Sequence, residues 1–155
     1  MVSTTLCLLI RENEISLAMK KRGFGIGWWN GFGGKIHPGE TNERAAIREL
    51  EEEAVVTASE KDLVYMGRIL FYFKNKPDWN TEMYVYVLKK WQGEPQETDE
   101  MKPAWFSFKK IPYDLMWVSD TKWLPLVLAG KRVEGTFHFI RDGKGIEKFE
   151  IREVP

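Results

Sequence analysis

The chain has 155 residues and is 43% hydrophobic, which suits one ordinary domain with a proper core. Basic and acidic residues number 23 each, so no global field would attract a nucleic-acid backbone or an anionic membrane. No apolar run approaches the length of a membrane span, and the single cysteine, Cys7, cannot form an internal disulfide. We therefore expect one domain over residues 1–155, monomeric and cytoplasmic, with neither a membrane nor polymeric nucleic acid as a partner.

The first segments predict a β-hairpin followed by a basic, glycine-rich loop. Residues 5–10 form an apolar run, residues 11–13 have turn composition, and residues 15–19 alternate between apolar and other side chains. A basic run at residues 20–22 then enters the glycine-rich stretch 23–27. Such a run is usually solvated, but beside an acidic metal site it could also clamp a polyphosphate.

Residues 28–34, WWNGFGG, combine aromatic side chains with glycines and predict a bent strand whose backbone approaches a neighbouring group closely. Asn30 has two interpretations. Its amide could read the edge of a base, or it could be a turn residue that bonds to local backbone. The sequence alone does not choose between them.

Residues 41–53 predict a helix, because Thr41 is a suitable N-cap and neither proline nor glycine interrupts the segment. Glu49, Glu52 and Glu53 stand at i, i+3 and i+4, so we expect them on one face. An acidic helix face is most often simply solvated. Three carboxylates that repel one another would, however, suit a divalent cation such as Mg²⁺, which prefers hard oxygen ligands.

The rest of the chain predicts more strands than helices. β-branched and aromatic residues indicate strands, and a polar residue before an apolar stripe indicates a helix. The expected elements are strands at residues 63–73, 83–88 and 104–108, a helix beginning near residue 119 or 120, and a hairpin of residues 137–141 and 148–154. At least one helix on each side of a mixed sheet is the expected packing.

Two loops carry further candidate residues. Residues 92–102 contain Glu97, Asp99 and Glu100, any of which could supply a fourth carboxylate to a metal, although most loop acids are solvated. Trp117 lies in an irregular stretch close to Asp120. An aromatic plate and a carboxylate together could bind a purine by stacking and edge hydrogen bonds.

The spacing from Gly34 to Glu40 and on to the helix sequence RELEE, residues 48–52, followed by Glu53, resembles the signature of the Nudix hydrolase superfamily. The family usually has glycine two residues after the last glutamate, where this chain has Val55. A β-branched residue disfavours the left-handed conformation that glycine commonly takes at a helix end. We therefore expect the metal site to be kept and the loop after the helix to take a different path.

Four further segments, MKKRGFG, WWNGFGGK, DEMKPAWF and IPYDLMW, resemble the MutT-type branch of this superfamily, which hydrolyses oxidised purine nucleoside triphosphates to the monophosphate and pyrophosphate. The resemblance covers almost the whole chain. It implies a single α/β domain, an α/β/α sandwich with a mixed β-sheet. It also implies a small nucleotide as substrate and dependence on Mg²⁺, with Mn²⁺ as the alternative ion.

By position, the resemblance also implies the site residues. The metal environment would consist of the Gly33 carbonyl, Glu49, Glu52, Glu53 and Glu100. Catalysis would depend on Glu49, Glu52 and Glu53, with Arg48 beside them. The base would be held by Asn30, Trp117, Ser119 and Asp120, the pocket would be lined by Phe24 and Phe71, and the sugar or phosphate side would be contacted by Thr5 and Lys20.

One departure bears on the substrate. The relatives carry two adjacent aspartates at the base edge, where this chain has Ser119 and Asp120, and a hydroxyl cannot ionise at neutral pH. The choice among 8-oxo, 2-oxo and methylated purines is therefore open. Two other functions also remain: hydrolysis of another nucleoside diphosphate derivative, such as a dinucleoside polyphosphate or a nucleotide sugar, and nucleotide binding without cleavage.

Overall fold

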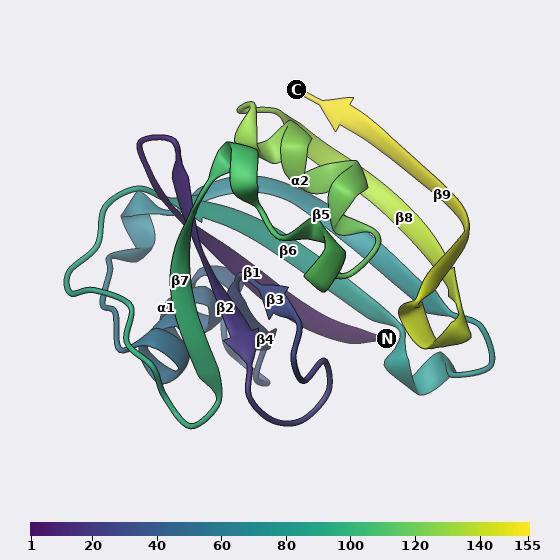
Figure 1. Ribbon diagram of the computed structural model, residues 1–155, viewed down its shortest axis with the longest axis horizontal. Coiled ribbons are helices and arrows are strands. Elements are labelled where there is room, and N and C mark those ends of the chain that lie inside the picture. Colours follow the sequence, from purple (N-terminus) through teal and green to yellow (C-terminus); the bar gives the residue numbers. More distant parts are fainter.

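A mixed β-sheet of nine strands forms the centre of the computed structural model, which describes residues 1–155 (Figure 1). The strands are β1 (Val2–Arg11), β2 (Glu14–Lys20), β3 (Trp29–Asn30), β4 (Phe32–Lys35), β5 (Val64–Phe73), β6 (Thr81–Leu88), β7 (Met101–Ser107), β8 (Arg132–Ile140) and β9 (Gly145–Val154). The α-helices are α1 (Asn42–Ala54) and α2 (Asp120–Leu128). Short 3₁₀ turns are found at Glu60–Asp62, Pro77–Trp79, Phe108–Lys110, Tyr113–Leu115 and Arg141–Gly143.

The strand order is β3-β2-β1-β6-β5-β8-β9, with β4 added to β1 and β7 added to β2. β1 and β6 are parallel, as are β5 and β8, whereas the other pairs are antiparallel. β1 lies in the middle of the sheet, which explains its continuous apolar run, because a strand buried on both faces needs no polar side. The expected hairpin of β1 and β2 is confirmed, with Leu9 opposite Ser16.

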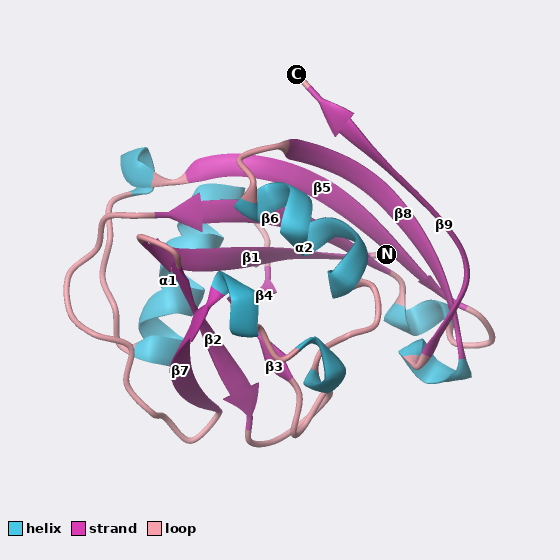
Figure 2. Cartoon of the chain, turned by 45° about the horizontal axis from the view of Figure 1, so that its top comes forward, coloured by secondary structure: helices cyan, strands magenta, loops and turns pink.

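The two α-helices lie on opposite faces of the sheet (Figure 2). α1 packs on β1 and β4, and Leu50 and Ala54 join Cys7, Leu9 and Phe32 in a buried cluster. α2 packs on the other face, over β8 and the larger of the two hydrophobic cores. The expected α/β/α sandwich around a mixed sheet is therefore confirmed. No helix is long and apolar enough to cross a membrane.

The predicted bent strand is also confirmed, and its break lies at Gly31. β3 pairs with β2, whereas β4 pairs with β1, so the chain changes partner between Asn30 and Phe32. A Cβ atom at Gly31 would lie 2.8 Å from the end of the Leu8 side chain and 3.2 Å from the Cys7 carbonyl oxygen, so a larger residue at the crossing would require Leu8 to move. The break brings Asn30 and Gly33 to the same region of the sheet.

Some element boundaries differ from the sequence-based expectation. β7 begins at Met101 rather than at residue 104, and it includes Pro103, which cannot donate a ladder hydrogen bond. The proline is tolerated because β7 pairs only with β2 and is therefore an edge strand. The closing hairpin is longer than expected, because β8 begins at Arg132 and β9 at Gly145.

The exit of α1 corrects the expectation for Val55. This residue adopts the left-handed conformation (φ 58°, ψ 37°), and its backbone N–H donates to the Glu51 carbonyl. The helix therefore ends in the left-handed conformation that glycine commonly takes at this position. A β-branched residue in this conformation is strained, since its Cβ crowds the following carbonyl.

Candidate active site

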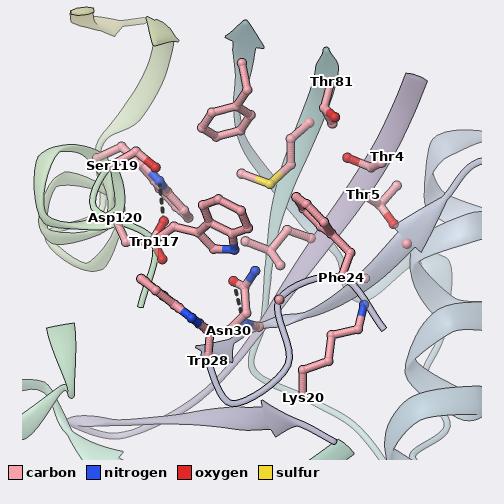
Figure 3. A pocket seen from close by; sticks show the side chains of 18 of the residues that line it. Thr4, Thr5, Lys20, Phe24, Trp28, Asn30, Thr81, Trp117, Ser119 and Asp120 are labelled. Atoms are coloured by element: carbon pink, nitrogen blue, oxygen red, sulfur yellow. Dashed lines mark hydrogen bonds between the residues drawn. The ribbon is translucent and has the colours of Figure 1, made fainter. Parts of the chain in front are cut away.

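A cavity of about 240 Å³ opens between the central strands and α2, and its walls differ in character from one end to the other (Figure 3). One end is aromatic, with Phe24, Trp28 and Trp117. The other end reaches the glycines of β4 and the last turn of α1, where Gly33 and Glu53 line it. The cavity therefore joins an apolar slot to an acidic helix.

The aromatic end is built around the ring of Trp117. Phe24 lies 5.3 Å from it and Trp28 lies 5.8 Å from it, with interplanar angles of 31° and 35°. Phe24 is supplied by the glycine-rich loop and also packs edge-on against Trp79 at 4.7 Å. Faces of aromatic rings directed into a cavity suit a flat, conjugated ligand, because stacking depends on the π-face alone.

Buried polar atoms without partners surround this slot. Four buried side-chain oxygen atoms lack a hydrogen bond, and three of them, Thr5 Oγ1, Ser119 Oγ and Asp120 Oδ2, belong to residues that line the cavity. The fourth is Ser16 Oγ, within the sheet. An unpaired buried polar group is costly and therefore rare in folded proteins. Three such atoms line one cavity, where they are available to form hydrogen bonds with a ligand or with water.

Asp120 is positioned by the helix that it begins. The indole N–H of Trp123, one turn later, donates a 3.0 Å hydrogen bond to Asp120 Oδ1. Burial raises the pKa of Asp120 to about 7, and the hydrogen bond from Trp123 lowers it less than burial raises it. Asp120 can therefore present either an acceptor or a donor to a ligand near neutral pH.

The helix α2 begins at Asp120, as expected, and Ser119 is its N-cap residue. Ser119 has helical backbone angles, however, and its side chain makes no capping hydrogen bond. Ser119 is only 1% exposed and lines the cavity beside Asp120. The hydroxyl is thus free to donate to or accept from a ligand.

Asn30 makes the local backbone bond of a turn residue and also lines the cavity. Its Oδ1 accepts a 2.9 Å hydrogen bond from the backbone N–H of Gly31, as a turn residue would. The side chain also lines the cavity, below Trp117 in Figure 3. Because its oxygen is engaged, the Asn30 amide offers the cavity its two N–H donors.

Glycines allow β4 to pack closely against α1 and β1. Gly33 donates a 2.8 Å hydrogen bond from its backbone N–H to Glu53 Oε1. A Cβ atom at Gly33 would lie 1.9 Å from the Thr5 carbonyl oxygen, and one at Gly34 would lie 2.6 Å from the Glu49 carboxylate. A side chain at Gly33 would therefore push β4 away from β1, and one at Gly34 would displace the Glu49 carboxylate of α1.

Arg48 holds the acidic face of α1 in place. Its Nε and Nη2 donate to both oxygens of Glu40 at 2.7 and 3.0 Å, and its Nη1 donates to Glu49 at 2.9 Å and Glu52 at 3.2 Å. Nη2 also donates to the Lys35 carbonyl at 2.9 Å. The hydrogen bonds from Arg48 lower the pKa of Glu40 to about 2. Arg48 does not line the cavity, but it links Glu40 to Glu49 and Glu52.

The three helix carboxylates are less alike than the sequence suggested. Glu53 is buried and directed towards Gly33, whereas the Glu52 side chain is 56% exposed. Burial raises the pKa of Glu53 to about 8 and also raises that of Glu49, and the charge of Glu100 adds to both effects. No group of three or more acidic, histidine or cysteine side chains is gathered closely enough to hold a metal ion directly. The oxygen donors, crowded negative charges and burial nevertheless fit a hard divalent cation.

The structure thus brings together most of the expected site residues. Those that line the cavity are Thr5, Lys20, Phe24, Asn30, Gly33, Glu53, Phe71, Trp117, Ser119 and Asp120. Arg48, Glu49, Glu52 and Glu100 are not part of the cavity lining. Glu100 instead pairs with Arg22 at 3.3 Å on the surface.

Sequence reasoning did not name the other lining residues as site residues. They are Thr4, Leu6, Gly25, Trp28, Gly31, Gly34, Phe73, Thr81, Met83, Met101, Trp123 and Phe139. Two of these residues could have been found from their spacing in the sequence. Phe73 follows Phe71 at the spacing that puts both on one face of a strand, and Trp123 follows Asp120 at helical spacing. Thr81, Met83 and Phe139 come from β6 and β8, distant in sequence from the other lining residues, and no local pattern reveals the pairing of these strands.

Comparison with known proteins identifies the family. The NUDIX domain pattern matches residues 2–127. The chain belongs to the NUDIX family. The oxidized purine nucleoside triphosphate hydrolase of Danio rerio is 45% identical to it over 135 residues, which cover 87% of this chain and 85% of that protein. The protein of the same name from Mus musculus is 40% identical over 150 residues, covering 97% and 94%.

The fold is also that of solved NUDIX proteins. A MutT protein from Bacillus halodurans superposes with a TM-score of 0.84 at 23% identity, over 97% of each chain. The expectation of a Nudix hydrolase resembling the MutT-type branch is therefore confirmed. Nudix hydrolases act on small nucleotides and generally use divalent metal ions.

Proposed function

We propose that the chain hydrolyses oxidised or otherwise modified purine nucleoside triphosphates, such as 8-oxo-dGTP and 2-oxo-dATP, to the monophosphate and pyrophosphate. The observation that carries this proposal is the set of three unpartnered polar atoms in one cavity, which joins an aromatic slot to an acidic helix. The names of the Danio rerio and Mus musculus relatives support it. So does the name of an Escherichia coli relative, 8-oxo-dGTP diphosphatase, which is 33% identical over 82 residues, 53% of this chain.

The base would occupy the aromatic end of the cavity. Trp117 would stack on the ring system, and Asn30 would donate to an acceptor on its edge. Ser119 and Asp120 would complete the edge, each able to donate or accept. Phe24 and Phe71 would enclose the base, which excludes water and strengthens these hydrogen bonds.

The triphosphate would lie at the other end, towards Glu53. Lys20 lines the cavity there and its charge acts on Glu53, so its ammonium is placed to pair with a phosphate. Thr5, with its unpartnered hydroxyl, would contact the sugar or phosphate side. Glu49, Glu52, Glu53, Glu100 and the Gly33 carbonyl would form the environment of Mg²⁺ or Mn²⁺.

Such an ion would neutralise the triphosphate and the charge that develops on the leaving pyrophosphate. A carboxylate of the helix set would orient or deprotonate the attacking water. Arg48 would act through Glu49 and Glu52, whose carboxylates it holds in one arrangement. Glu40 would in turn fix Arg48 by the two hydrogen bonds it accepts.

The proposal is tested by steady-state pyrophosphate release with Mg²⁺, with Mn²⁺ and with chelator. The panel is dGTP, 8-oxo-dGTP, 2-oxo-dATP, O6-methyl-dGTP, a dinucleoside polyphosphate and ADP-ribose. We expect metal-dependent turnover that favours a modified purine triphosphate over dGTP. Turnover of the last two compounds alone would reject the base pocket, and binding without any turnover would show a nucleotide-binding module.

A further inference from the structure

The loop between β6 and β7 is fastened to the end of α1. The backbone N–H of Gln96 donates to the Ala54 carbonyl at 2.9 Å, and the hydroxyl of Thr98 donates to the Glu53 carbonyl at 3.3 Å. The last four carbonyls of a helix have no partner within the helix. Two loop residues therefore cap the helix end that carries Glu53.

Thr98 uses its whole hydrogen-bonding capacity in this arrangement. Besides donating to Glu53, its hydroxyl oxygen accepts from the backbone N–H groups of Glu100 at 3.3 Å and Met101 at 3.2 Å. A hydroxyl has one proton and two lone pairs, so three bonds leave none unused. The Thr98 N–H also donates to the Met101 carbonyl at 2.9 Å, which closes the turn.

The turn fixes the backbone of Glu100 but leaves its carboxylate free to move. Lys21 adds two bonds, from its backbone N–H to the Glu100 carbonyl and from Nζ to the Thr98 carbonyl, both at 2.8 Å. The Glu100 side chain has one ion pair, with Arg22, and both partners are about half exposed or more. Exposed ion pairs contribute little to stability, so the Glu100 carboxylate can exchange Arg22 for another cation.

The other acids of this loop are placed differently. Glu97 is engaged by Lys21 Nζ at 2.7 Å, and no side-chain hydrogen bond or ion pair holds Asp99. The charge of Glu100 contributes to the raised pKa values of Glu49 and Glu53, as expected of a carboxylate on a turn that is fastened to the end of α1.

We propose that Thr98 is a positioning residue, whose hydroxyl holds Glu100 beside Glu53 and so completes the environment of the metal ion. The inference rests on the proposed function, because it assumes that these carboxylates bind a divalent cation. Thr98 touches neither the cavity nor a reacting group. It acts by joining two backbone segments that each carry one of the carboxylates.

The test is Mn²⁺ affinity without nucleotide, measured from the electron paramagnetic resonance signal of free Mn²⁺. Thr98→Val removes the hydroxyl at nearly constant size, and we expect it to weaken Mn²⁺ binding by about 10-fold, as loss of a group that supports metal ligands typically does. Thr98→Ser keeps the hydroxyl and should bind as the wild type does. Thr57→Val is the matched control, a nearby exposed threonine with no side-chain hydrogen bond.

A second comparison separates positioning from general loosening of the loop. In the Glu100→Gln background, Thr98→Val should change Mn²⁺ affinity no further, because its effect passes through Glu100. An equal loss in both backgrounds, or unaltered affinity in Thr98→Val, would overturn the inference. If Thr98→Val does not fold, the inference requires that Thr98→Ser binds Mn²⁺ as the wild type does and that Thr98→Ala binds it more weakly. Wild-type protein that binds no Mn²⁺ and releases no pyrophosphate would instead overturn the proposed function.

Discussion

Gly33 and Glu53 are joined by a 2.8 Å hydrogen bond from a backbone N–H to a buried carboxylate. Gly33 lies on β4, which pairs with β1 beside Thr5, and Glu53 lies in the last turn of α1. Both line the same cavity as Trp117. The aromatic slot and the acidic helix are therefore two ends of one site. β4 lies between them, and its glycines allow it to pack closely against β1 and α1.

Arg48→Lys should lower turnover without unfolding the protein. Lysine keeps the charge but cannot span Glu40 with two parallel hydrogen bonds while reaching Glu49, as the guanidinium does. Loss of such a supporting partner typically reduces metal affinity or activity by about 10- to 100-fold. The measurement is kcat for 8-oxo-dGTP as a function of Mg²⁺ concentration. Arg44→Lys, on an exposed part of the same helix, is the control, and equal losses in the two variants would refute the role of Arg48.

Val55→Gly should stabilise the protein by about 0.5–1 kcal/mol. Relief of the left-handed strain is worth about 1–2 kcal/mol, and the extra flexibility of unfolded glycine offsets about 0.4–1 kcal/mol of it. Val55 is 51% exposed, so little apolar burial is lost. Urea unfolding measures the change. Val64→Gly, at a similarly exposed strand position, should destabilise instead, and destabilisation by Val55→Gly as well would contradict the strain.

Asp120 should make folding stability depend on pH. Below about pH 4 the group is protonated in both states, but as the pH rises the unfolded chain ionises first, because burial raises the folded pKa from 3.8 to about 7. Stability is therefore lost up to about pH 7. Asp120→Asn removes this loss, so its stability relative to wild type should rise by about 2–3 kcal/mol between pH 5 and pH 8. Urea unfolding at both pH values tests this, and a pH-independent difference would contradict the buried ionisation.

The fold was largely predictable from local pattern. The cap at Thr41, the apolar stripe of α1 and the alternation in the hairpins are properties of neighbouring residues, and the structure bears them out. The start of β7 and the conformation of Val55 were not predictable in this way. Pro103 is tolerated because β7 is an edge strand, and Val55 adopts the left-handed conformation although its β-branch disfavours it.

The candidate site was predictable where a motif carried it. The spacing of Glu49, Glu52 and Glu53 is visible in the sequence, but their unequal burial depends on Gly33, which lies on another element. The same holds for Thr81 and Met83, which reach the cavity only because β6 pairs in parallel with β1. Contacts between distant strands leave no trace in a local pattern.

The most direct test of the central claim is turnover of 8-oxo-dGTP by Glu53→Gln. Glutamine can still accept from the Gly33 N–H, so the fold should persist while the charge needed at the phosphate end is lost. We predict that kcat falls by orders of magnitude whereas binding of 8-oxo-dGMP at the aromatic end is retained, and that Glu51→Gln, exposed on the same helix, changes neither. Wild-type turnover by Glu53→Gln would contradict the account, because it would remove the acidic helix from the chemistry.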